Sequence, residues 1–173
     1  MKRFLTSTIL IAALAVSACT NPNRFGADGS GGANANAGIN GSVLPGSASD
    51  PSSTAYFQQA IGDRVLFEVD QSNLTAVGRA TLDGQAGWLL ANTDYQAVIE
   101  GHADEQGTRE YNLALGARRA NSAQEYLVSK GVPASRLRVV SYGKERPIEI
   151  CSEEACYAKN RRAVTVLAGG LTS

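Results

Sequence analysis

The chain has 173 residues and a mass of 18.1 kDa, and its 16 Lys and Arg residues balance 16 Asp and Glu residues. This balance lacks the basic excess of a nucleic-acid-binding domain, and a single histidine argues against a metal site built on several imidazoles. Once an N-terminal leader and a polar segment are set aside, the length allows one domain.

The first 19 residues have the layout of a secretory signal. Residues 1–3 are basic at two positions, residues 4–16 are mostly apolar, and the small residues Ser17 and Ala18 precede Cys19. The apolar stretch is shorter than the roughly 20 residues that span a bilayer. Its end resembles a bacterial lipobox, which predicts that residues 1–18 are removed and that Cys19 becomes lipidated. An ordinary signal peptide with an incidental cysteine is the alternative.

A polar segment follows the predicted lipidation site. Residues 20–53 are dominated by Gly, Ala, Asn and Ser and have no apolar periodicity. Such a segment cannot bury enough apolar surface to offset its conformational entropy. We therefore expect residues 19–53 to be a lipidated cysteine and a flexible tether, which spans about 30–35 Å as a random coil. The globular domain is expected over residues 54–173.

Short β-rich runs alternate with longer helical patterns in this domain. Strands are expected at 64–69, 95–100, 136–141 and 162–167. A helix over 75–92 has its apolar positions at Leu82, Ala86, Leu89 and Leu90. Because it contains three glycines, tertiary packing must stabilise it, with Trp88 covering part of it.

A second helix is expected over residues 109–130. Thr108 is its predicted N-cap, and Gly131 followed by Pro133 should end it. Its core face, at helical spacing, is predicted to be Leu113, Ala117, Ala120, Ala123 and Leu127. The alternation of strands and helices predicts an α/β (α+β) sandwich with helices packed on a mixed sheet.

Two cysteines remain besides Cys19. Cys151 and Cys156 are separated by four residues, and an exported chain reaches an oxidising compartment, so we expect a disulfide that closes the loop before the last strand. A metal pair is disfavoured by the single histidine, and a redox role by the lack of Cys-x-x-Cys spacing.

The most informative stretch is 98–120. A strand-like run breaks at Gly101, and a polar loop and then a helix follow it. The polar residues of this stretch include His102, Asp104, Glu105, Asn112, Arg118 and Arg119. A carboxylate after a strand and a guanidinium on the next helix suit a zwitterionic amino acid, because Asp pairs with an ammonium and Arg takes a carboxylate bidentately.

This stretch, with residues 140–145 and 160–164, resembles the lipoprotein branch of the OmpA-like peptidoglycan-binding domain family, and the resemblance covers roughly 54–168. It implies a βαβαββ arrangement. It also implies that Asp104 contacts the amine, and Arg119 the carboxylate, of the free D-centre of meso-diaminopimelate in the stem peptide. Amidation of that carboxylate should weaken binding. An Asp–Arg salt bridge that only orients the loop is the alternative.

The resemblance extends the expected site to other positions. Phe67 and Asp70 match a Phe-x-x-Asp pattern after the first strand, although Phe67 could equally be core, and Arg161 is expected to reach the edge of the site. Arg118 lies about 100° around the helix from Arg119, so both cannot face the ligand equally.

Several neighbours are assigned supporting roles. Asn112 should hydrogen-bond to the ligand or to the Asp104 loop. His102 should organise that loop through side-chain hydrogen bonds or contact the ligand weakly. Glu105 should stay in solvent or brace the loop, Leu115 should support the core, and Asn160 should fix a turn.

The function implied by the resemblance is non-catalytic. It is an outer-membrane lipoprotein with its domain facing the periplasm, which binds peptidoglycan and takes part in envelope integrity and cell division. Its partners would be the periplasmic Tol propeller protein and other Tol components, with no cofactor, metal or nucleic acid. A lipoprotein that only recruits periplasmic proteins is the first alternative. A cell-wall enzyme is disfavoured, because no Ser lies in a nucleophile-elbow context and the thiols are expected to be bridged.

Overall fold

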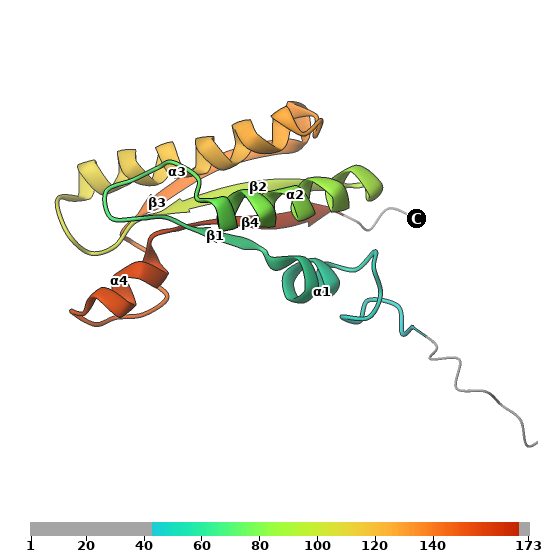
Figure 1. The fold of residues 1–173 in the computed structure, drawn as a ribbon, viewed down its shortest axis with the longest axis horizontal. Coiled ribbons are helices and arrows are strands. Elements are labelled where there is room, and N and C mark those ends of the chain that lie inside the picture. Colours follow the sequence, from blue (N-terminus) through green and yellow to red (C-terminus); the bar gives the residue numbers. More distant parts are fainter. Residues whose placement is uncertain (1–42, 170–173) are drawn as a thin grey trace, which may run out of the picture. The chain divides into compact units, whose positions relative to one another are not determined.

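The computed structural model describes residues 43–169 (Figure 1). The predicted signal peptide, Cys19 and residues 20–42 of the predicted tether lie outside the described residues. The end of that tether belongs to the domain instead. Trp88 Nε1 donates to the carbonyl of Pro51 at 2.7 Å, and the buried Ser53 donates to the carbonyl of Ser47 at 2.6 Å. The domain therefore begins before residue 54, because side chains distant in sequence stabilise these turns.

One mixed sheet is formed by four strands within residues 43–169. Its order is β1 (Arg64–Leu66), β4 (Arg162–Gly169), β2 (Tyr95–His102) and β3 (Leu137–Gly143). β4 is antiparallel to both of its neighbours, and β2 is parallel to β3. The predicted mixed sheet is confirmed. The first strand is shorter than predicted, because the chain leaves the sheet at Phe67.

The two long helices lie on one face of the sheet (Figure 1), as the α/β prediction requires. They are α2 (Ala76–Ala91) and α3 (Arg109–Ser129). Thr108 caps α3 by accepting from the N–H of Tyr111, and Gly131 follows the helix with φ of 101°. The predicted start and end signals of α3 are therefore confirmed. Among the described helices, none is long and apolar enough to cross a membrane.

Several shorter helices were not predicted. They are α1 (Thr54–Tyr56), the π-helical η1 (Phe57–Gly62), the 3₁₀ turn η2 (Ala134–Arg136) and α4 (Glu154–Asn160). α4 lies between β3 and β4, so it is an addition to the expected βαβαββ order. The Cys151–Cys156 disulfide closes the segment that leads into α4, which confirms the predicted bridge.

The predicted core faces were partly wrong. Leu90 on α2 is 44% exposed and Leu113 on α3 is 48% exposed. On α3 the buried face instead carries Asn112, Leu115 and Arg119, with Ala120, Ala123 and Leu127 continuing it. The prediction assumed an apolar face, whereas the first half of α3 turns polar side chains inward.

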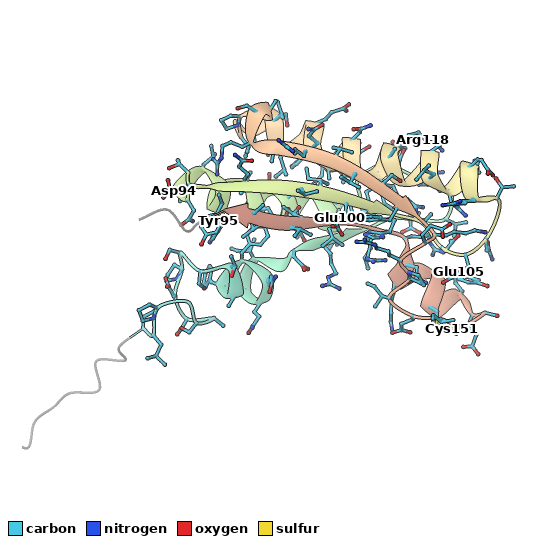
Figure 2. All side chains as sticks on the ribbon, turned by 180° about the vertical axis from the view of Figure 1, so that it is seen from behind. Asp94, Tyr95, Glu100, Glu105, Arg118 and Cys151 are labelled. Atoms are coloured by element: carbon cyan, nitrogen blue, oxygen red, sulfur yellow. A yellow bond between two sulfur atoms is a disulfide. The ribbon has the colours of Figure 1, made fainter. Side chains whose placement is uncertain are left out.

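Two glycines set the distance between α3 and β2. A Cβ built on Gly101 would lie 1.8 Å from the carbonyl oxygen of Gly116, so the helix backbone rests directly on the strand. This contact lies near the end of β2 that leads into the Glu105 loop. Figure 2 shows Glu105 and Cys151 at that end of the domain and Tyr95 at the other. The close contact thereby fixes the start of α3 beside this loop.

Candidate functional site

A pocket of about 260 Å³ opens beside the end of β2. Three segments form its walls: the chain after β1, the loop between β2 and α3, and the first turns of α3. The lining residues are Val69, Asp70, Asp104, Gln106, Gly107, Tyr111, Asn112 and Leu115. Two carboxylates therefore face a pocket that has an apolar wall at Leu115.

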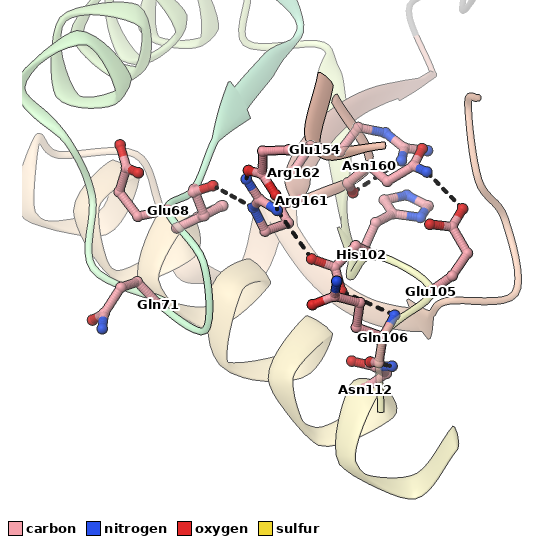
Figure 3. A network of polar contacts seen from close by, with 12 residues as sticks. Glu68, Gln71, His102, Glu105, Gln106, Asn112, Glu154, Asn160, Arg161 and Arg162 are labelled. Atoms are coloured by element: carbon pink, nitrogen blue, oxygen red, sulfur yellow. Dashed lines mark hydrogen bonds and ion pairs between the residues drawn. The ribbon is translucent and has the colours of Figure 1, made fainter. Parts of the chain in front are cut away.

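Asp104 is the most enclosed carboxylate of the pocket, with 7% of its surface exposed. Its Oδ1 accepts from the N–H of Gln106 at 3.3 Å, and its Oδ2 lies 3.1 Å from Nη1 of Arg161. The loop is also held from α3, since Asn112 Nδ2 donates to the carbonyl of Gln106 at 2.6 Å (Figure 3). The carboxylate is thus fixed in position before any ligand arrives.

Asp70 forms the opposite rim of the pocket. It has a left-handed φ of 57°, which Asp tolerates better than most residues, and its carboxylate accepts from the hydroxyl of Tyr111. This bond joins the segment after β1 to the first turn of α3. The rim is therefore closed by a contact between residues 41 positions apart.

Arg119 lies behind the pocket wall and is fully buried. Its guanidinium donates to three backbone carbonyls: Gln71 at 2.8 Å, His102 at 2.9 Å and Glu68 at 3.3 Å. Burial lowers the pKa of Arg119 to about 10, an effect that Asp104 partly opposes, so the side chain stays charged at neutral pH. Arg119 therefore fastens the segment after β1 to the end of β2.

The end of α4 braces the same loop from the other side. Asn160 is fully buried, and its Nδ2 donates to Oε1 of Glu105 at 2.7 Å. Next to it, Arg161 bonds Asp104, the carbonyl of Phe67 at 3.2 Å and the carboxylate of Glu154 (Figure 3). Both carboxylates of the loop, Asp104 and Glu105, are thus held by consecutive residues.

Comparison with known proteins identifies this arrangement. The sequence profile of the OmpA family matches residues 66–161. A peptidoglycan-associated lipoprotein of Mesorhizobium japonicum is 49% identical over 163 residues, which are 92% of this chain and 89% of that protein. This chain belongs to the OmpA family, in its branch of peptidoglycan-associated lipoproteins. A relative of that name from Pseudomonas aeruginosa is 44% identical and covers 79% of this chain and 78% of its own.

Solved structures of the OmpA-like fold agree. The crystal structure of the peptidoglycan-associated lipoprotein from Burkholderia pseudomallei superimposes with a TM-score of 0.62 at 35% identity, over 70% of this chain and 98% of that chain. The C-terminal domain of Helicobacter pylori MotB, at 20% identity, has a TM-score of 0.58 over 61% of this chain and 84% of that chain. That second likeness concerns the fold alone.

The OmpA-family pocket brings together some of the predicted site residues. Asp70, Asp104 and Asn112 line it, while Arg119 and Arg161 lie behind its wall. Asn112 bonds the Asp104 loop, which was one of its two predicted roles.

The other predicted residues are placed in supporting positions. Phe67 is in the hydrophobic core, with its ring 5.4 Å from the guanidinium carbon of Arg119, and it does not line the pocket. Glu105 braces the loop through its bond with Asn160, which was one of its two predicted roles. Asn160 was predicted to fix a turn, and its Oδ1 accepts from the N–H groups of Ile148 and Glu149. Arg118 is exposed. Leu115 is buried as expected and also forms the apolar wall of the pocket.

Sequence reasoning missed Tyr111, Gln106 and Glu154. The hydroxyl of Tyr111 closes the pocket rim, and its place on the helix face beside Asn112 could have suggested such a role. Gln106 contributes its backbone N–H to Asp104 and its backbone carbonyl to Asn112. Its residue type therefore gave no indication of this role. Glu154 lies on a helix that the sequence did not predict.

His102 does not line the pocket and is 2% exposed. Its ring stacks on Tyr142, with ring centres 5.6 Å apart, and among the described residues neither ring nitrogen has a hydrogen-bond partner. Burial, followed by the charges of Arg162 and Arg146, lowers the pKa of His102 to about 4. His102 therefore supports the loop by packing and through its backbone carbonyl, which differs from the predicted side-chain bonding.

We expect the free energy of unfolding to fall by roughly 3 kcal/mol between pH 6.5 and 4 on account of His102. In this range the unfolded chain binds a proton at the imidazole and the folded chain does not, so acid favours unfolding. Urea unfolding at several pH values should show this loss. The His102→Phe variant, which keeps the ring stack, should lack it. A folded-state titration of this single histidine near pH 6.5 by NMR would contradict the prediction.

Proposed function

We propose that this lipoprotein binds peptidoglycan non-covalently, through the zwitterionic end of diaminopimelate in the stem peptide. The observation that carries the proposal is Asp104, a carboxylate held rigidly in the wall of a small pocket with Asp70 on the opposite rim. A pocket lined by two carboxylates favours an ammonium group. The names of the relatives support peptidoglycan as the source of that group.

We assign the carboxylate of the same zwitterion to the part of the pocket wall that lies in front of Arg119. In the structure three of the five N–H groups of Arg119 are taken by backbone carbonyls, and the side chain is fully buried. Its positive charge acts on the pocket through the wall. A direct bidentate contact with a ligand carboxylate requires the segment at Glu68–Gln71 to shift and release part of the guanidinium.

In this proposal the domain is tethered to the outer membrane by the lipid on Cys19 and faces the periplasm. Many weak stem-peptide contacts over the wall then give strong overall attachment. The periplasmic Tol propeller protein and other Tol components are its proposed protein partners in envelope integrity and cell division. The role is binding, with no chemical step assigned to any residue.

Calorimetric titration of the chain from residue 20 onward, with a diaminopimelate-containing stem peptide, tests the proposal. We expect Asp104→Asn to bind about 100-fold more weakly, because a charge-assisted contact in an enclosed site is lost. Asp94→Asn, at the opposite end of β2 and exposed, is the matched control and should bind like the wild type.

A stem peptide with lysine in place of diaminopimelate separates two interpretations. It keeps an ammonium but lacks the second carboxylate, so it should bind much more weakly. Equal binding of both peptides would contradict recognition of the zwitterion. A wild-type protein that ignores both peptides would favour a domain that only recruits periplasmic proteins.

A further inference from the structure

We propose that Glu154, carried on the disulfide-closed turn Cys151–Cys156, is a positioning residue of the pocket that keeps Asp104 available for a cationic ligand. The inference rests on the proposed function, because it concerns how the same pocket takes an ammonium group. It assigns a role in ligand affinity to α4, which does not line the pocket.

The geometry is that of one buried guanidinium shared by two carboxylates. Arg161 is 3% exposed, and its Nη1 lies 3.1 Å from Oδ2 of Asp104 and 3.4 Å from Oε2 of Glu154. Its Nη2 donates to the other oxygen of Glu154. Glu154 therefore holds Arg161 from the solvent side, while Asp104 holds it from the pocket side.

The charges explain why this sharing matters. Arg161 and Asp104 alone would neutralise each other, and a ligand ammonium that drew Asp104 away would leave a buried guanidinium unpaired, which is costly. With Glu154 the three groups carry one net negative charge. Asp104 can then pair with an ammonium from its fixed position, while Arg161 keeps Glu154 as an anionic partner.

The ionisation states agree with this arrangement. The hydrogen bond from Arg161 holds the pKa of Glu154 below its usual value, although partial desolvation opposes it. Burial alone would lower the pKa of Arg161, but its bonds with Glu154 and Asp104 raise it. Glu154 and Arg161 are therefore both charged at neutral pH.

The disulfide supplies the position of Glu154. α4 has only seven residues, too few to be stable by itself in water. The bridge joins Cys151, before the helix, to Cys156 within it, with the two Cα atoms 6.1 Å apart, so it encloses Glu154. At the other end of α4, Asn160 is anchored to Glu105. Glu154 is thus fixed from both ends of its helix.

Binding of the diaminopimelate stem peptide to the Glu154→Gln and Glu153→Gln variants tests the inference. Glu153 is the matched control, because it is exposed in the same turn and has no ion-pair partner within residues 43–169. We expect Glu154→Gln to bind the peptide about tenfold more weakly, with an affinity that depends less on salt concentration than that of the wild type. The affinity of Glu153→Gln should stay within about twofold of the wild-type value.

A second variant tests the role of the disulfide. Cys151→Ser combined with Cys156→Ser should weaken binding to a similar extent as Glu154→Gln, with the far-UV circular dichroism of the domain retained. Adding Glu154→Gln to the serine pair should cause little further loss, because both changes act through the same contact.

The outcomes separate the two proposals. If the wild type binds and Glu154→Gln binds equally well, the role of Glu154 is wrong and the proposed function stands. If the losses from Glu154→Gln and from the serine pair multiply, the disulfide does not act through Glu154. If the wild type itself does not bind the peptide, the proposed function fails, and the role of Glu154 fails with it.

Discussion

Replacing Arg119 with Leu should lower the free energy of unfolding by about 4 kcal/mol and abolish stabilisation of the domain by the stem peptide. The guanidinium satisfies the buried carbonyl of His102 and the partly buried carbonyls of Glu68 and Gln71. A buried carbonyl left without a partner costs about 1–3 kcal/mol, and a partly buried one costs less. The cation that we propose attracts the ligand carboxylate is lost in the same step. Urea unfolding measures the first effect, and the rise in Tm with added peptide measures the second.

Arg118→Leu is the matched control for this prediction. Arg118 is the next residue on α3 but is exposed, with its guanidinium carbon 6.0 Å from the ring of Tyr111. Its loss should change stability by less than about 0.5 kcal/mol and leave the peptide-induced rise in Tm intact. If Arg119→Leu lowers stability but the peptide still raises its Tm fully, Arg119 is a structural residue and the ligand carboxylate is bound elsewhere.

Local signals in the sequence predicted much of the scaffold. Thr108 and Gly131 mark the two ends of α3. They could be predicted because capping depends on residues within one turn of the helix end. Asp104, after the end of β2, and Asn112, on α3, line the same pocket because the strand, the loop and the helix are consecutive in the chain. Such short-range relations can be inferred from a single chain.

The surroundings of Arg119 could not be inferred in this way. Its acceptors at Gln71 and Glu68 are 48 and 51 residues away. They are backbone carbonyls, so the residue types at these positions do not indicate that they accept hydrogen bonds from Arg119. The same buried arginine explains why the predicted core face of α3 was wrong at Leu113. The prediction placed only apolar residues on the buried face of α3. It therefore left out Asn112 and Arg119, which are buried.

The contribution of α4 was hidden for a related reason. Seven residues give too little periodicity for a helix prediction, so the disulfide was predicted without the helix that it holds. Arg161 was expected at the site edge, but its partners Asp104 and Glu154 lie 57 and 7 residues away on separate elements. Their meeting depends on the pairing of β1, β4 and β2, which only the folded sheet reveals.

Replacing Gly101 with Ala should destabilise the domain by about 3 kcal/mol or more. The added Cβ would lie 1.8 Å from the carbonyl oxygen of Gly116 and 3.1 Å from the Cβ of Ala120, so α3 must move away from β2. Chemical denaturation measures the loss. Gly87→Ala is the control, because nothing lies within 4 Å of its Cβ in the exposed part of α2, and it should raise stability by up to about 1 kcal/mol.

The same substitution links packing to the pocket. A displaced α3 carries Asn112 and Arg119 with it, and these residues hold the carbonyls of Gln106 and His102 on either side of Asp104. In the folded fraction of Gly101→Ala, stem-peptide affinity should therefore fall together with stability, although no lining residue of the pocket has changed. A variant that loses stability but binds with wild-type affinity would show that Asp104 is positioned by α4 through Arg161 rather than by the start of α3.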